Sequence, residues 1–176
     1  MNAYVYPARI QAAEEGGWLI SFRDFPEGIS QAGPGQDPVD VAEGCLQACI
    51  EGRLEDGLDI PPPSQARRGE VPVAVPLESA SKAALFAAVS TSGLTRLALA
   101  AAVGVDEKEI RRMLDPRHSS KLPRIARVLK ALGKELQLSV VDIPKTPAAT
   151  SAPKSGAPRQ AMQRRAKYRV GGRCKL

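Results

Sequence analysis

The chain has 176 residues, of which 43% are apolar and 25% charged, and its formal net charge is +6. This length suits one average domain, or two small domains and a tail, and we favour the second arrangement. No apolar run reaches the roughly 18 residues of a membrane span, and the N-terminus lacks a basic region followed by an apolar one. We therefore expect a cytoplasmic protein without a membrane partner. Three cysteines, an odd number, do not indicate a disulfide framework.

The net charge conceals a division along the chain. Residues 1–78 carry 5 Lys/Arg and 13 Asp/Glu, residues 79–142 carry 11 and 6, and residues 143–176 carry 9 and none. The net charges of these segments are therefore −8, +5 and +9. An acidic surface attracts a basic protein, and a basic surface attracts nucleic acid. The division predicts two domains with different partners, followed by a basic tail.

A β-hairpin is predicted to open the first domain. Apolar residues alternate over residues 4–10 and again over residues 18–22, and the glycine-containing residues 14–17 lie between them. Residues 29–32 predict a third strand. Trp18 is expected to be buried and to hold the sheet together, because a buried indole contributes a large apolar area.

A helix and a fourth strand complete the first domain. Asp37 is a suitable N-cap and Pro38 a suitable first residue, so a helix is predicted from Pro38 to about Asp56. Its core-facing side should be formed by residues at helical spacing, namely Ala42, Cys45, Leu46, Cys49, Ile50 and Leu54. Residues 71–75 alternate as a strand, in which Pro72 must direct its missing N–H away from a ladder partner. The predicted order is βββαβ.

Residues 94–114 have the pattern of a helix-turn-helix, two short helices joined by a sharp turn. Thr95 can cap the first helix, and Gly104 can take the left-handed conformation that ends it. Asp106 and Glu109 are spaced as a capping pair for the second helix, which should begin one residue after Asp106. The expected packing residues are Ala100, Val105, Ile110 and Leu114.

The second helix of this pair is predicted to carry the DNA-reading side. With Ile110 directed at the core, Lys108 and Arg112 project from the opposite side at one turn's spacing, where they can reach guanine in a major groove. Arg96, Arg111 and Lys121 are better placed for phosphates. The predicted DNA-binding residues are Arg96, Glu107, Lys108, Arg111, Arg112 and Lys121. The alternative is an ordinary helical hairpin whose charged side is only solvated.

Further elements are predicted on both sides of this pair. Apolar spacing over residues 84–89 indicates a lead helix, and a last helix opens at Pro123 and is closed by Gly133. Residues 136–141 alternate as a strand that needs a partner, and we expect it to pair with the same strand of a second copy in a homodimer or higher homo-oligomer. Residues 143–176 have no apolar period and predict a disordered basic tail.

An ordered set of motifs runs through residues 4–142. It comprises Tyr6-Pro7-Ala8, Glu15-Gly16-Gly17-Trp18, Ser21-Phe22, Phe25-Pro26-Glu27, the helix after Asp37, Pro61-Pro62, Val71-Pro72-Val73, Ala80-Ser81-Lys82, the helix-turn-helix and Ala131-Leu132-Gly133-Lys134-Glu135-Leu136. In this order the motifs resemble the HicB-type antitoxins of bacterial toxin–antitoxin systems. The resemblance implies a partial RNase H-like domain at residues 1–78 that neutralises HicA, a small messenger-RNA-cleaving toxin. It also implies a helix-turn-helix domain at residues 79–142 that binds operator DNA and represses the pair's own genes.

Other interpretations stand beside this one. The main rival is a stand-alone helix-turn-helix transcriptional regulator whose acidic domain binds or senses something else, and a weaker one is a nuclease using Asp24 and Glu27. A two-metal nuclease site needs several converging carboxylates, so we do not expect an enzyme. Cys45 and Cys49 have no second pair of ligands at matching spacing, so we expect core packing rather than a metal or cofactor. His118, the sole histidine, is expected in a loop near DNA.

Overall fold

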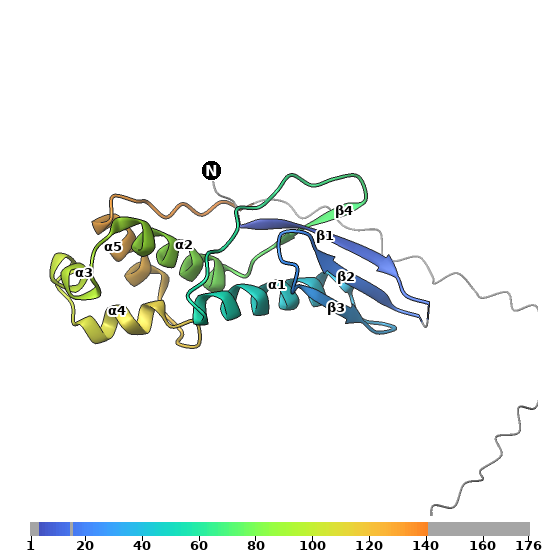
Figure 1. Ribbon diagram of the computed structural model, residues 1–176, viewed down its shortest axis with the longest axis horizontal. Helices are drawn as coiled ribbons and strands as arrows, with labels where there is room; N and C mark the ends of the chain where they lie inside the picture. Colours follow the sequence, from blue (N-terminus) through green and yellow to red (C-terminus); the bar gives the residue numbers. More distant parts are fainter. Residues whose placement is uncertain (1–3, 15, 141–176) are drawn as a thin grey trace, which may run out of the picture. The chain divides into compact units, whose positions relative to one another are not determined.

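The computed structural model describes residues 4–14 and 16–140 (Figure 1). Over these residues the chain is mixed α+β: a four-stranded sheet, with one helix between its third and fourth strands, is followed by four more helices. The elements are β1 (Val5–Ala12), β2 (Trp18–Phe22), β3 (Ile29–Ala32), α1 (Pro38–Glu55), β4 (Glu70–Ala74), α2 (Leu77–Ser92), α3 (Arg96–Val103), α4 (Glu107–Leu114) and α5 (Leu122–Ala131). The predicted order βββαβ is confirmed, and the predicted basic tail at residues 143–176 lies outside the described residues.

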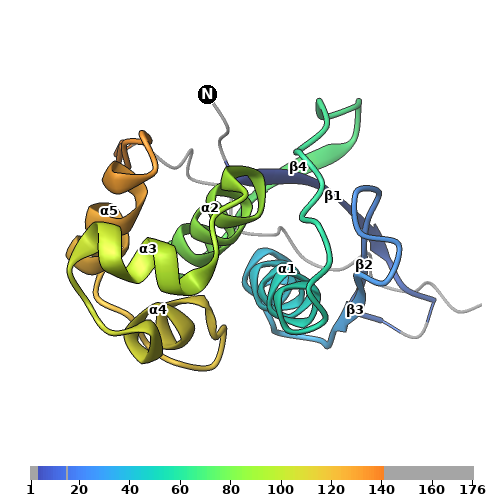
Figure 2. The same ribbon diagram turned by 60° about the vertical axis from the view of Figure 1, so that its left-hand side comes forward.

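The sheet is antiparallel, with the strand order β3-β2-β1-β4, and α1 packs across one of its faces (Figure 2). The local signals for α1 act as predicted. The Asp37 side chain accepts a hydrogen bond from the Val39 N–H at 2.8 Å, and Pro38 is the first helical residue. The core-facing side of α1 is formed by the buried residues Ala42, Leu46, Ile50 and Leu54. Cys45 and Cys49 are partly buried against the same core, as their spacing predicts.

β4 forms one edge of the sheet and pairs with β1 so that Pro72 lies opposite Pro7. The Val75 N–H donates to the Tyr4 carbonyl oxygen at 2.9 Å, and mutually bonded pairs recur at every second residue of an antiparallel ladder. Pro7 and Pro72 therefore form a pair without mutual hydrogen bonds, and neither missing N–H interrupts the ladder. This confirms the prediction for Pro72.

The core between sheet and helix is centred on Tyr6 and Phe25, whose rings meet edge to face with centroids 4.9 Å apart. The Tyr6 hydroxyl donates to the Pro61 carbonyl oxygen at 2.8 Å, which ties the loop before β4 to the sheet. Trp18 is only partly buried, so the prediction that it is a central core residue was wrong. Trp18 pairs with Ala12 in the last register pair before the hairpin turn, and this position at the end of the sheet leaves it incompletely covered.

α2 contributes to two hydrophobic cores. Ala83 belongs to the core between the sheet and α1, whereas Leu85 and Ala88 belong to a second core shared with α3, α4 and α5. The predicted domain boundary between residues 78 and 79 thus falls inside α2.

The capping signals around α3 and α4 are met in part. The Thr95 hydroxyl oxygen accepts a hydrogen bond from the Ala98 N–H at 3.1 Å, and Gly104 ends α3 in the left-handed conformation with φ of 71°. α4 begins at the expected residue, but the Asp106 side chain makes no capping hydrogen bond. The predicted capping pair was therefore wrong. The Glu109 carboxylate instead forms an ion pair with Arg124 of α5 at 3.2 Å, and this tertiary contact draws it away from the helix start.

Residues 134–140 have no regular secondary structure in this single chain, whereas the sequence predicted a strand from residue 136. A strand needs a neighbour for its backbone hydrogen bonds, so pairing with a second copy stays a prediction. Leu136 packs against the second core, while Leu138 and Val140 are exposed. Among the described helices none alone has the length and hydropathy of a membrane span; α2 and α3 reach them only together, and they are bent by 109° where they meet.

Candidate nucleic-acid interface

The α3–α4 pair exposes its charged residues on one side of a small apolar core. Ile110 and Met113 of α4 are buried, and Leu114 is partly buried. Met113 was not among the predicted packing residues, although its spacing from Ile110 places it on the same side of the helix. Lys108 and Arg112 are exposed, as the helical spacing predicts.

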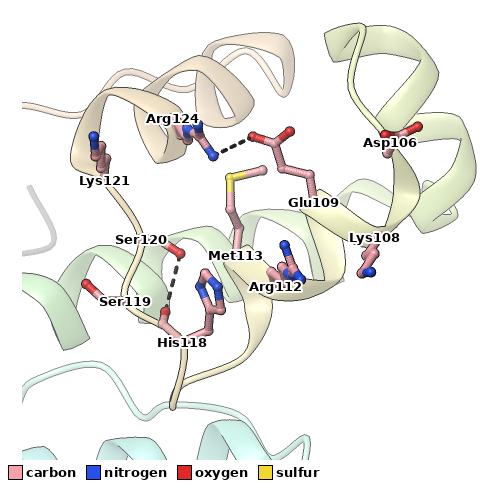
Figure 3. Close-up of a pocket in the computed structure, with 10 residues that line it drawn as sticks. All are labelled: Asp106, Lys108, Glu109, Arg112, Met113, His118, Ser119, Ser120, Lys121 and Arg124. Atoms are coloured by element: carbon pink, nitrogen blue, oxygen red, sulfur yellow. Dashed lines mark hydrogen bonds and ion pairs between the residues drawn. The ribbon is translucent and has the colours of Figure 1, made fainter.

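A pocket lies between α4 and the segment that leads into α5 (Figure 3). α4 contributes Lys108 and Arg112 to one wall, and the segment of residues 118–121 forms the other wall together with Arg124. The lining residues are Asp106, Lys108, Glu109, Arg112, Met113, His118, Ser119, Ser120, Lys121 and Arg124. The structure therefore brings three of the predicted DNA-binding residues, Lys108, Arg112 and Lys121, to one place.

The other three predicted residues do not line this pocket. Arg96 is exposed at the first position of α3, Glu107 is partly buried at the first position of α4, and Arg111 is exposed on α4. Their predicted DNA contacts stay predictions. The predicted set also lacked the serines at positions 119 and 120, because hydroxyl residues in a loop give no periodic signal in a sequence.

The electrostatics of the pocket are decided by which charges have partners. Glu109 is paired with Arg124 at 3.2 Å. Within the described residues, Lys108, Arg112 and Lys121 form no ion pair. Asp106 also lines the pocket and is likewise unpaired among these residues, so the unpaired charges sum to +2, which favours a negatively charged ligand.

The wall of residues 118–121 is a compact turn. Asp115, which caps the C-terminus of α4, accepts the Arg117 N–H with its side chain at 2.9 Å and the His118 N–H with its carbonyl oxygen at 3.2 Å. The Ser120 hydroxyl donates to the His118 carbonyl oxygen at 3.4 Å. Lys121 is the N-cap of α5, and no side chain caps that helix. Exposed His118 thus lies in a loop beside the cationic pocket.

The sheet domain uses several of its charges internally. Asp24 accepts hydrogen bonds from the Ser64 N–H and hydroxyl, both at 3.0 Å. Glu27 forms an ion pair with Arg53 at 2.6 Å, and the hydrogen bond from Arg53 lowers the pKa of that carboxyl. These two carboxylates therefore hold separate parts of the domain, and no group of three or more metal-ligating side chains occurs within residues 4–14 and 16–140.

The cysteines of α1 behave as core residues. Burial raises the pKa of the Cys45 thiol, and it raises the pKa of Cys49 to about 12. Burial therefore disfavours the thiolate form of both side chains, as in cysteines that pack in a core. The structure thus gives both side chains a packing role against the sheet.

Comparison with known proteins gives a consistent result. A family model described as "HicB_like antitoxin of bacterial toxin-antitoxin system" matches residues 5–84. The chain is 36% identical over 135 residues to Antitoxin HicB 1 of Photorhabdus laumondii, covering 77% of this chain and 86% of that relative. It is 35% identical over 136 residues to Antitoxin HicB of Escherichia coli K12, covering 77% of this chain and 99% of that relative. Antitoxin HicB of Pseudomonas fluorescens is 25% identical over 128 residues, covering 72% and 88%.

Proposed function

Because the chain belongs to the HicB-like antitoxins of bacterial toxin–antitoxin systems, we propose that it inhibits a HicA-type messenger-RNA-cleaving toxin and represses its own operon. The N-terminal βββαβ domain, proposed to be partial RNase H-like, binds the toxin. The α3–α4 pair acts as a helix-turn-helix on operator DNA. Neither role requires a catalytic residue or a cofactor.

Toxin binding is supported by the charge of the N-terminal domain. Residues 1–78 have a net charge of −8. On and after α1, Asp40, Glu43, Asp56 and Asp59 form no ion pair within the described residues. Unpaired carboxylates attract a basic partner at range and repel nucleic acid. A small protein that binds messenger RNA is expected to be basic, so this surface suits it.

The observation that carries the DNA-binding proposal is the trio of unpaired cations in the α4–α5 pocket. Lys108 and Arg112 project from the exposed side of α4 one turn apart. Side chains at this spacing on a groove-bound helix contact neighbouring base pairs, and both can donate to guanine O6 and N7. Lys121 lies across the pocket at the start of α5 and is suited to a backbone phosphate.

A homodimer would present two such surfaces. Helix-turn-helix proteins bind two half-sites related by the dimer axis. The segment after α5 offers a means of association, because Leu138 is 62% exposed and Val140 fully exposed in the single chain. Pairing of residues 136–141 between two copies would cover these side chains and satisfy their backbone groups.

Operator binding is tested with Arg112→Ala in the full-length protein. Binding of a duplex carrying the sequence upstream of the gene pair, and of a scrambled duplex, is measured across a salt series. Arg112→Ala should weaken operator binding by about 1 to 3 kcal/mol and relax preference at one base pair in each half-site. Lys130→Ala is the matched control, because Lys130 is an exposed cation in the last turn of α5 that does not line the pocket. Equal weakening of both duplexes by Arg112→Ala would show that α4 contacts phosphates and does not read sequence.

Toxin inhibition is tested by co-expression with the neighbouring reading frame. Co-purification of its product and loss of messenger-RNA cleavage in the complex are expected. If the neighbouring product neither binds nor cleaves RNA while operator binding persists, the stand-alone regulator would be the better description.

A further inference from the structure

Lys82 is a buried lysine in a motif to which the proposed function gives no role. It lies on α2 and is only 2% exposed. Its ammonium group forms no ion pair within the described residues and instead donates to backbone carbonyl oxygens of Asp115, His118 and, at 3.4 Å, Pro116. Burying an ammonium group is costly unless its hydrogen bonds are satisfied, and these three acceptors meet that need.

The three carbonyl groups belong to the turn between α4 and α5. Asp115 is the C-cap of α4, so the Lys82 charge lies at the end of the helix where the dipole favours a cation. From this buried position Lys82 holds the turn that leads directly into residues 118–121. This segment is one wall of the α4–α5 pocket, and α4 itself forms the other. Lys82 therefore contacts the turn that carries one wall, including the backbone of His118, although its own side chain does not line the pocket.

The wall held by Lys82 has the chemistry of an anion site. Lys121 contributes an unpaired cation and Ser119 a hydroxyl group at the same wall, whereas the Ser120 hydroxyl donates to the His118 carbonyl oxygen. α5 has no side-chain cap and no acidic residue of its own in its first turn, and the Glu109 carboxylate that reaches this turn is paired with Arg124. Arg112 adds positive charge from the opposite wall (Figure 3).

We propose that this pocket binds one phosphate group of the DNA backbone, and that Lys82 is the positioning residue that keeps the pocket formed. The inference rests on the proposed operator binding and adds the place where the backbone is held. A phosphate at the wall of residues 118–121 leaves Lys108 and Arg112 of α4 free to reach the bases. The pocket then adds affinity for any duplex, while the choice of sequence stays with the side chains of α4.

The pocket is tested first without DNA. Isotope-labelled full-length protein is titrated with inorganic phosphate at constant ionic strength, and backbone amide shifts are followed by NMR. Saturable shifts should concentrate at residues 119–122 and disappear in Lys121→Gln, whereas Lys130→Gln should leave them unchanged. Shifts spread evenly over all basic residues, or no saturation, would refute a phosphate site.

The positioning role is tested with Lys82→Met on operator and scrambled duplexes. Loss of one phosphate contact should weaken both equally, by about tenfold, and reduce the salt slope by about 0.9, as in Lys121→Gln. The ranking of sequences should not change, and this separates Lys82 from Arg112. Arg117→Gln is the control, because Arg117 lies in the same turn but pairs with Glu55 on the surface with its side chain 79% exposed.

Three further outcomes are distinguished. A folded Lys82→Met protein with unchanged affinity and slope would overturn the positioning role. If Lys82→Met fails to fold, Lys82→Gln, which keeps two donors without the charge, is measured with the same expectation. If the wild-type protein binds no duplex, the proposed operator binding fails, while the phosphate titration still decides whether the pocket takes phosphate.

Discussion

Because α2 packs on the sheet domain, we expect a fragment of residues 1–78 to be less stable than one of residues 1–92. Residues 79–92 supply Ala80, Ala83 and Phe86 to the core between the sheet and α1. They also supply the Ser79 hydroxyl, which donates to Glu51 at 3.0 Å. Removing these residues therefore uncovers part of the sheet domain's own core.

The loss can be estimated from these contacts. Half-burial of Phe86 contributes about 1 kcal/mol, and the two alanine methyl groups contribute about 0.8 kcal/mol each. The Ser79–Glu51 hydrogen bond contributes about 0.5 to 1 kcal/mol. The total of about 3 kcal/mol is a large part of the roughly 5 kcal/mol expected for so small a domain.

Urea unfolding followed by circular dichroism measures the difference. With a denaturant slope of about 1 kcal/mol/M, the midpoint of the 1–78 fragment should lie about 3 M below that of the 1–92 fragment. Phe86→Ala in the longer fragment should lower its midpoint by about a third of this difference. Both fragments, when folded, should inhibit the toxin. Equal midpoints would refute the inference that α2 stabilises the sheet domain.

Three other predictions follow from the sheet domain. Phe25→Ala should lower the free energy of unfolding by about 3 to 5 kcal/mol, because Phe25 is fully buried. Trp18→Ala should lower it by less than half as much, because Trp18 is only partly buried. Equal losses for the two variants in urea unfolding would contradict this difference in burial. Since burial raises the pKa of Cys49 to about 12, its thiolate fraction at pH 8 is about a thousandth of that of an ordinary thiol. Iodoacetamide should therefore label Cys49 only after unfolding. Rapid labelling of Cys49 in the native protein, mapped by mass spectrometry, would show that α1 is not packed on the sheet. Because the hydrogen bond from Arg53 lowers the pKa of Glu27, the wild type should be more stable than Glu27→Gln, with the full difference above pH 4.5 and its loss as the pH falls through the lowered pKa. If the difference in the free energy of unfolding persists in acid, it comes from packing and not from the ion pair.

The sequence by itself determined the elements whose signals are local. The Asp37 cap, the Thr95 cap and the left-handed Gly104 act through backbone groups no more than a few residues away, so their positions follow from the residue types. Alternation placed the strands, and helical spacing placed the buried side of α1 and the exposed side of α4, because both periods are fixed by backbone geometry.

Only the tertiary structure decided the features that depend on contacts distant in the sequence. The large apolar side chain of Trp18 suggested a core residue, but its place at the end of the sheet leaves it partly exposed. Phe25, which lies outside the strands, is fully buried. Glu109 had the spacing of a capping residue, but Arg124 draws its carboxylate across to α5.

The residues of the candidate site also fall into those that the sequence identified and those that only the tertiary structure identified. The periodicity of α4 identified Lys108 and Arg112, since both lie on one helix. The serines opposite them, and the buried Lys82 behind them, come from a loop and from another helix, and no spacing in the sequence relates these segments to α4. They come together because α2, α4 and α5 share one hydrophobic core, and the packing of that core brings the turn after α4 within reach of a lysine 33 residues earlier.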